Sequence, residues 1–159
     1  MAKSRQSTPT WHTCAVPTGQ RRDAWRSGRG RSVLEPLGEW WDAVALTPLA
    51  FGLHVLTGMR LSPRAGYPVI GDLGHDTAYV MVSPHSADGA PVVDGVRVLG
   101  AGHLLLVPDT VRTASPHGTF CAHWISAPRA DRYERLVDGQ TLAAHLHQLH
   151  STHRKAPAS

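Results

Sequence analysis

Histidine is the first residue type whose number and spacing in this sequence could support chemistry. The 159 residues include 11 histidines, and the densest group lies near the C-terminus. A zinc site needs three or four ligands at about 2.0 to 2.3 Å, and this stretch contains no carboxylate or cysteine to complete one. We therefore interpret the group as a solvated helix end and expect no bound metal. Its members are His145, His147, His150 and His153.

The arginine-rich N-terminal segment is the second candidate. Residues 1–31 carry seven basic side chains and one acidic side chain, a net charge of +6, whereas the other 128 residues carry nine basic and eleven acidic ones, a net charge of −2. A flexible basic segment binds phosphates largely through counterion release. We therefore predict an arm for nucleic acid, although a solvated tail without a partner stays open. The arm residues are Arg21, Arg22, Arg26, Arg29 and Arg31.

The motifs of several enzyme classes are missing from the sequence. There is no GxSxG nucleophile motif and no GxxxxGK[ST] phosphate loop. The GxG formed by Gly100 and Gly102 lies between two predicted strands, where we expect a tight hairpin turn. Cys14 and Cys121 match no paired metal-ligand spacing, so we expect both to be buried as small apolar side chains. His123 is expected to be a hydrogen-bonded residue of a strand.

The apolar pattern predicts a single α+β domain over residues 32–150. The run at 40–48 predicts a buried strand, and the helical spacing of Leu49, Leu53 and Leu56 predicts a helix directly after it. Further short apolar runs, each bounded by Gly, Pro or Asp, predict strands of one mixed sheet. These runs are PVIG, TAYVMV, VRVLG, HLLLVP and FCAHWI.

The two ends of the chain differ from this central pattern. Residues 1–31 are predicted to be a flexible basic segment, with a short strand at 11–17 and a loop after it. Asp138 and Thr141 are candidate N-caps of a C-terminal helix that ends near residue 150 and covers the domain. Residues 151–159 are predicted to be a disordered tail.

Four phrases in the sequence resemble a known family in the family's own order. GVRVLGAGHLLLVPDT resembles the segment GvDvRgxGGyvvaPPS of the bifunctional primase/polymerase (prim-pol) domain, and HDTAYVMV resembles its GGxHxYF strand. ALTPLAFG resembles lDvDpxnGG, and HGTFCAHWI resembles the closing GxxYxW. The phrases span residues 45–125, about half of the chain. The resemblance implies a prim-pol-like fold of the archaeo-eukaryotic primase superfamily.

The resemblance also implies where the chemistry would lie. In the family, two Asp of the first motif and one Asp of the third hold divalent metal for nucleotidyl transfer, and a strand His contacts the nucleotide. The first pair falls on Ala45 and Thr47, the His on Thr77 and the third Asp on Arg97, so every catalytic position departs from the family pattern. Arg97 would repel Mg²⁺ and could instead receive a phosphate directly. The candidate phosphate- or nucleotide-binding residues are His75, Arg97 and His103.

Together these observations predict a catalytically degenerate prim-pol-like domain that binds nucleic acid or a nucleotide without metal-dependent catalysis. We expect no cofactor, no membrane partner and a cytoplasmic location, because no signal-peptide pattern or long apolar run occurs. Two alternatives stay open. One is a protein-interaction scaffold without a nucleic-acid role. The other is an active, Mg²⁺-dependent DNA primase/polymerase, which would require acids to converge on one face from among Asp42, Asp76, Asp94 and Asp109.

Overall fold

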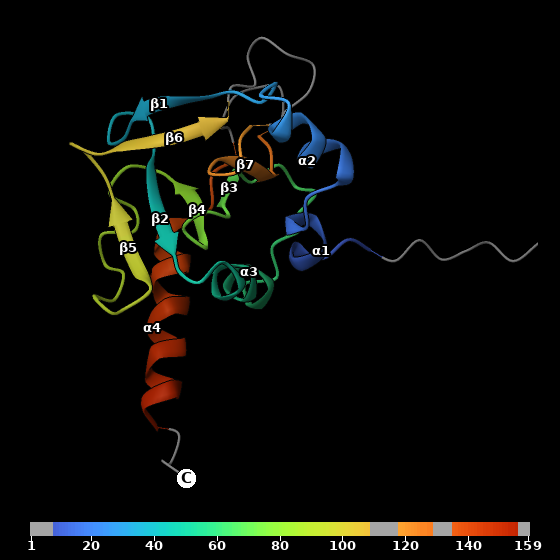
Figure 1. Cartoon of the computed structure of the whole chain (residues 1–159). Helices are drawn as coiled ribbons and strands as arrows, with labels where there is room; N and C mark the ends of the chain where they lie inside the picture. The colour runs from blue at the N-terminus through green and yellow to red at the C-terminus, as the bar shows by residue number, and fades with distance from the viewer. Residues whose placement is uncertain (1–7, 109–117, 129–134, 156–159) are drawn as a thin grey trace, which may run out of the picture.

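The computed structural model describes residues 8–108, 118–128 and 135–155, and these form an α+β fold (Figure 1). The α+β class, the strand–helix unit and the C-terminal helix that the sequence predicts are confirmed. In chain order, the elements are α1 (Trp11–Ala15), α2 (Gly19–Arg26), β1 (Ser32–Pro36), β2 (Asp42–Leu46), α3 (Leu49–Gly58), β3 (Val69–Asp72), β4 (Thr77–Val82), β5 (Val96–Leu99), β6 (Leu104–Pro108), β7 (His123–Ser126) and α4 (Gly139–Lys155).

A five-stranded sheet forms the centre of the fold, in the order β5-β2-β4-β3-β7. Every pairing between its named strands is antiparallel. The prediction of a mixed sheet is wrong, because β4 lies between β2 and β3 and pairs antiparallel with both. The two strands joined by α3 therefore run in the same direction without being neighbours. A parallel bridge does occur outside the named strands, between Val82 and Val137.

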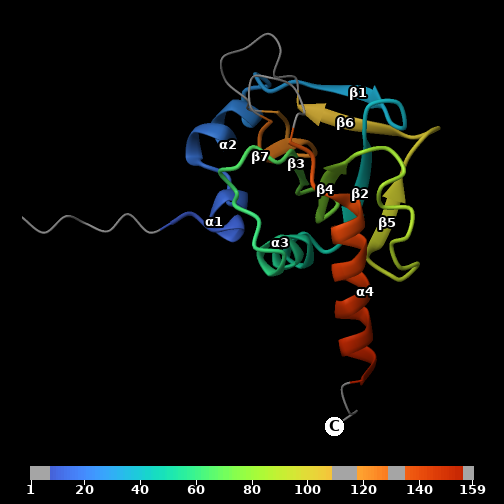
Figure 2. The same cartoon turned by 180° about the vertical axis from the view of Figure 1, so that it is seen from behind.

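One face of this sheet is covered by helices. Side chains of β2 and β4 that alternate toward this face, such as Leu46 and Val80, are fully buried in one cluster with residues of α1, α3 and α4. Figures 1 and 2 both show α3 and α4 on this side of the sheet. Trp11 of α1 is 2% exposed, and its indole nitrogen donates to the carbonyl of Leu61 at 2.7 Å.

The opposite face is covered by a two-stranded ribbon in which β1 pairs antiparallel with β6. Leu105 and Val107 of the ribbon are buried in a second cluster with Ala43 and Met81 of the sheet. The expectation of a single sheet is therefore wrong. The hairpin expected at Gly100–Gly102 is also wrong, because β5 pairs with β2 while β6 pairs with β1. The glycine turn instead carries the chain from the sheet to the ribbon.

The N-terminal segment is helical where a strand and a loop were predicted. Thr10 caps α1 by accepting from the backbone nitrogen of Thr13 at 3.1 Å, and Thr18 caps α2 in the same way. Such side-chain caps satisfy free N–H groups at a helix start and favour a helix there. At the other end, α4 continues to Lys155, beyond the predicted end near residue 150. In the described part of the chain, no helix is long and apolar enough to cross a membrane.

Candidate functional site

The four positions singled out by the motif comparison lie together on one face of the sheet. Ala45 of β2 pairs directly with Arg97 of β5 on one side and with Tyr79 of β4 on the other. Directly opposed residues of antiparallel strands share a face. In the next row, the hydroxyl oxygens of Thr47 and Thr77 are 2.9 Å apart. We call Ala45, Thr47, Thr77, Tyr79 and Arg97 the Arg97 face.

The Arg97 face combines a buried floor with exposed polar groups. Ala45 and Thr77 are buried, whereas Thr47 and Arg97 are exposed. Among the described residues, Arg97 takes part in no ion pair. In that part of the chain no carboxylate pairs with its guanidinium, and the fork of N–H donors suits a phosphate.

Gly95, just before β5, allows the backbone of Thr47 to lie close to the start of that strand. The backbone nitrogen of Thr47 donates to the Gly95 carbonyl at 2.9 Å. Gly95 has a φ of 84°, and a Cβ added there would lie 2.5 Å from the Thr47 carbonyl oxygen. Both facts require glycine at this position.

Tyr79 stands between the two ends of the face. Burial raises the pKa of the Tyr79 phenol, the Asp72 carboxylate raises it further, and the Arg97 guanidinium lowers it. The phenol is therefore neutral at physiological pH and lies within electrostatic reach of both charges. The sequence reasoning did not single out Tyr79, although it lies in the TAYVMV run.

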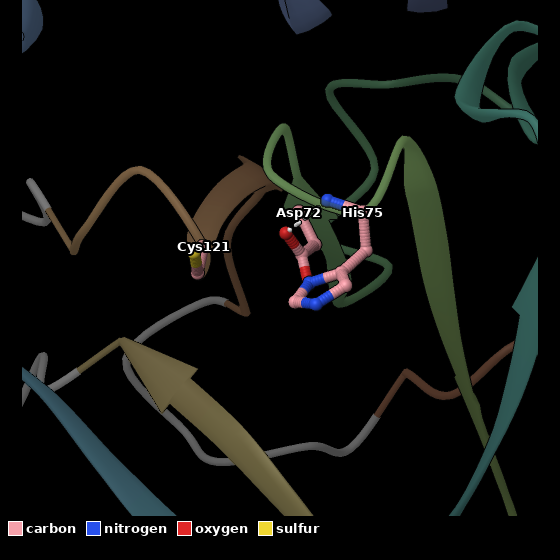
Figure 3. Close-up of side chains that lie close together, drawn as sticks. All are labelled: Asp72, His75 and Cys121. Atoms are coloured by element: carbon pink, nitrogen blue, oxygen red, sulfur yellow. Dashed lines mark hydrogen bonds and ion pairs between the residues drawn. The ribbon is translucent and has the colours of Figure 1, made fainter.

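A second group of chemically active side chains adjoins the Thr77 end of the face (Figure 3). Asp72 at the end of β3 accepts from the backbone nitrogen of His75 at 2.9 Å, and its other oxygen lies 2.7 Å from His75 Nδ1. One potential ligand atom from each of Asp72, His75 and Cys121 lies within 4.8 Å of the others. We call these residues the Asp-His-Cys cluster.

Sequence reasoning missed this cluster as a unit. The DxxH spacing of Asp72 and His75 was a usable signal, but Cys121 joins them only through the pairing of β3 with β7. The prediction that Cys14 and Cys121 are buried is wrong, because both are half-buried.

The other candidate histidines lie in different places. His75 is next to the Arg97 face, because the Thr77 hydroxyl donates to the His75 carbonyl at 2.9 Å. His103 is exposed in the turn before β6, beyond the opposite end of β5, with its Nδ1 at 3.3 Å from the Gly100 carbonyl. On α4, His147 Nε2 lies 2.6 Å from the Gly89 carbonyl. In the described part of the chain, the metal-capable groups do not include the α4 histidines.

His123 is fully buried in β7. Neither of its ring nitrogens has a hydrogen-bond partner among the described residues, so the expectation of a hydrogen-bonded histidine is wrong. Its ring centroid is 5.2 Å from that of Trp25. Burial, and then the charge of Arg21, lowers the pKa of His123 to about 4. The imidazole is therefore neutral at pH 7.

The arm arginines lie on α2 and in the chain that follows it. Arg21 donates from Nη1 to the Trp124 carbonyl at 2.9 Å, and burial lowers its pKa. Arg26 is 4.0 Å from Asp23, and Arg29 donates to the Ser27 hydroxyl. The side chains of Arg22 and Arg31 are exposed and take part in no ion pair among the described residues.

The arm and the Arg97 face lie at opposite edges of the sheet. The carbonyl that Arg21 contacts belongs to β7, whereas Arg97 belongs to β5, four strand spacings away. At about 4.8 Å per strand, this separation is about 19 Å. The two basic regions therefore do not form one compact site.

The described acids of the active-enzyme alternative lie at both ends of β2, with Asp76 and Asp94 by the end opposite to Asp42. Asp42 at the start of β2 accepts from the backbone nitrogen of His85. Asp76, near the opposite end of that strand, accepts from the backbone nitrogen of Leu49 at the start of α3. Asp94 is exposed before β5, and Asp109 lies outside the described residues.

Comparison of the chain with protein-family models, with curated proteins and with solved structures found no match. The resemblance to prim-pol domains thus stays a prediction that depends on the four sequence phrases.

Proposed function

We propose that this chain is a catalytically degenerate prim-pol-like module that binds the phosphates of a nucleic acid on its Arg97 face. The observation that carries the proposal is the direct pairing of Arg97 with Ala45. Under the family resemblance, both positions would hold metal-binding carboxylates. Here an exposed guanidinium stands beside a methyl group, an arrangement that favours bare phosphate over a metal ion.

The rest of the Arg97 face supports phosphate binding. Thr47 is exposed and lies two residues after Ala45, the residue that pairs with Arg97. Its hydroxyl is a group that commonly contacts phosphate oxygens. The Thr77 hydroxyl donates its hydrogen to the His75 carbonyl. In the contact between the two threonines, the Thr47 hydroxyl is therefore the donor and the Thr77 oxygen the acceptor. A phosphate that accepts from Thr47 would therefore compete with that pair.

A nucleic acid is favoured over a single nucleotide by the position of the arm. Arg22 and Arg31 are exposed, and Arg21 of the same segment anchors it to β7, about 19 Å across the sheet from the β5 strand that carries Arg97. One nucleotide does not span that distance, whereas several consecutive nucleotides of a strand do.

The test is fluorescence anisotropy of a labelled single-stranded oligonucleotide, titrated with the full chain at increasing salt. We expect binding that weakens with salt, and we expect Arg97→Ala to reduce the slope of log K against log salt by about 0.7. Arg154→Ala, which removes an exposed arginine at the far end of α4, is the matched control. An unchanged slope in Arg97→Ala, or no binding at low salt, overturns the proposal.

A second variant tests the arm. Deleting residues 1–31 would also remove the buried Trp11, so the double substitution Arg22→Ala/Arg31→Ala is preferable. We expect it to weaken oligonucleotide binding while leaving competition by a mononucleotide unchanged. Equal loss of both would indicate a mononucleotide site instead.

A further inference from the structure

We propose that Asp72, His75 and Cys121 form a mononuclear binding site for a divalent transition metal ion, of which Zn²⁺ is the best match. This site goes beyond the proposed phosphate binding and does not depend on it. It uses none of the positions that correspond to the metal-binding acids of the resembled family.

The backbone already holds the three residues near one another. Asp72 is the last residue of β3, and its carboxylate fixes the following turn by accepting from the His75 backbone nitrogen. The backbone nitrogen of Leu73 donates to the Phe120 carbonyl at 3.1 Å, which ties this turn to the segment that carries Cys121. Thr119 and Ala122 exchange backbone hydrogen bonds on either side of Cys121 and close its turn.

Gly74 provides an independent observation. A Cβ added to Gly74 would lie 3.0 Å from Cys121 Sγ and 3.3 Å from Asp72 Oδ1. Its φ is outside the left-handed region, so the backbone conformation alone does not require glycine. The missing side chain therefore leaves room where the thiol and the carboxylate converge.

The charge of the cluster also indicates a cation. Asp72 is 5% exposed, yet among the described residues its ion-pair partner is the His75 ring rather than a lysine or arginine. The contacts of both Asp72 oxygens with His75 compensate part of the cost of burying this carboxylate. A dication would compensate both this carboxylate and the thiolate that Cys121 forms on binding.

The combination of ligand types selects the class of metal. Thiolate and imidazole ligands disfavour Mg²⁺ and Ca²⁺, which prefer oxygen, and are typical of Zn²⁺. The potential ligand atoms lie within 4.8 Å of one another, and side-chain rotations on metal binding would bring them to about 2.0 to 2.3 Å from one ion. Three protein ligands leave a fourth position open, and the His75 side chain is 75% exposed, so solvent or a small ligand can reach that position.

The experiment is titration of the metal-free full chain with Co²⁺, followed by the thiolate-to-cobalt charge-transfer absorption in the near ultraviolet. We expect this band to saturate at one Co²⁺ per chain and to disappear when Zn²⁺ is added. Cys121→Ser should abolish the band, whereas Cys14→Ser, which removes the other half-buried thiol, should leave it intact. Absence of the band in the natural chain, or its persistence in Cys121→Ser, overturns the proposal.

A second pair of variants keeps the test valid if Cys121→Ser fails to fold. His75→Asn should weaken Co²⁺ binding by at least about tenfold, since even outer-shell losses have effects of that size. His54→Asn is the control, because His54 is an exposed histidine of α3 and belongs to neither group of potential metal ligands in the described part of the chain. Equal weakening by both variants would contradict the assignment. Arg97→Ala should leave the band unchanged, which separates this site from the proposed phosphate site.

Discussion

The two faces of the five-stranded sheet are built from the same strands but differ in what their ends expose. On the helix-covered face, the alternating side chains of β2 and β4 are apolar and fully buried, as Leu46 and Val80 illustrate. On the ribbon-covered face, the alternating residues are apolar near Ala43 but end in Thr47 and Thr77. Both faces therefore carry a buried cluster that stabilises the fold, and the ribbon-covered face also presents polar groups where its apolar cover ends.

The largest loss of stability is expected when a buried side chain of the helix-covered face is removed. Leu46 has no exposed surface, so Leu46→Ala should lower the free energy of unfolding by about 2 to 5 kcal/mol. Leu34→Ala in the ribbon removes the same atoms from a residue that is 62% exposed, and should change stability by less than about 0.5 kcal/mol. Urea unfolding of both variants measures the difference. Similar losses in the two would contradict the assignment of Leu46 to the buried core.

His123 at the β7 edge makes the stability of the fold depend on pH. His123 pairs with Gly71 and shares the helix-covered face with Ile125. Its pKa is about 4 when folded and about 6.5 when unfolded. As the pH falls from 6.5 to 4, the unfolded chain takes up a proton that the folded chain excludes, so the free energy of unfolding falls by about 3 kcal/mol in total. Below pH 4 this contribution stays lost.

The measurement is urea unfolding at several pH values in metal-free buffer. His123→Met keeps an apolar side chain of adaptable shape and should flatten the stability profile between pH 6.5 and 4. His54→Met removes an exposed histidine of α3 and should leave the slope as it is. A slope that persists in His123→Met would show that another group is responsible.

The apolar runs predict most of this fold, because each buried strand has a short apolar stretch and a clear stop. β3 and β4 appear where PVIG and TAYVMV predict them. The ribbon strand β1 escapes prediction, since SVLEP has two exposed apolar residues, Val33 and Leu34, and no buried alternation. Strand pairing also escapes prediction, because β5 and β6 are neighbours in the chain and belong to different sheets.

The candidate site, like the fold, could be predicted from the sequence only in part. Period-two alternation predicts that Ala45 and Thr47 share a face, and it predicts the same for Thr77 and Tyr79. That these two strands are adjacent depends on tertiary pairing, as does the approach of Cys121 to Asp72. Local pattern therefore identifies one half of each contact, and the topology supplies the other half.

A smaller loss of stability is expected at the pair of threonines, Thr47 and Thr77, where the ribbon-covered face becomes polar. Thr77 is 6% exposed and its hydroxyl contacts both the His75 carbonyl and Thr47. Thr77→Val keeps the shape but removes both contacts, and should lower stability by about 1 kcal/mol.

Thr57→Val is the control on α3, where the hydroxyl of the exposed residue Thr57 donates to the Leu53 carbonyl at 2.8 Å. Water can replace that bond, so stability should change by less than about 0.5 kcal/mol. Thermal unfolding compares the two variants. If Thr77→Val is as stable as the natural chain, the contacts of this buried hydroxyl with Thr47 and the His75 carbonyl do not stabilise the fold.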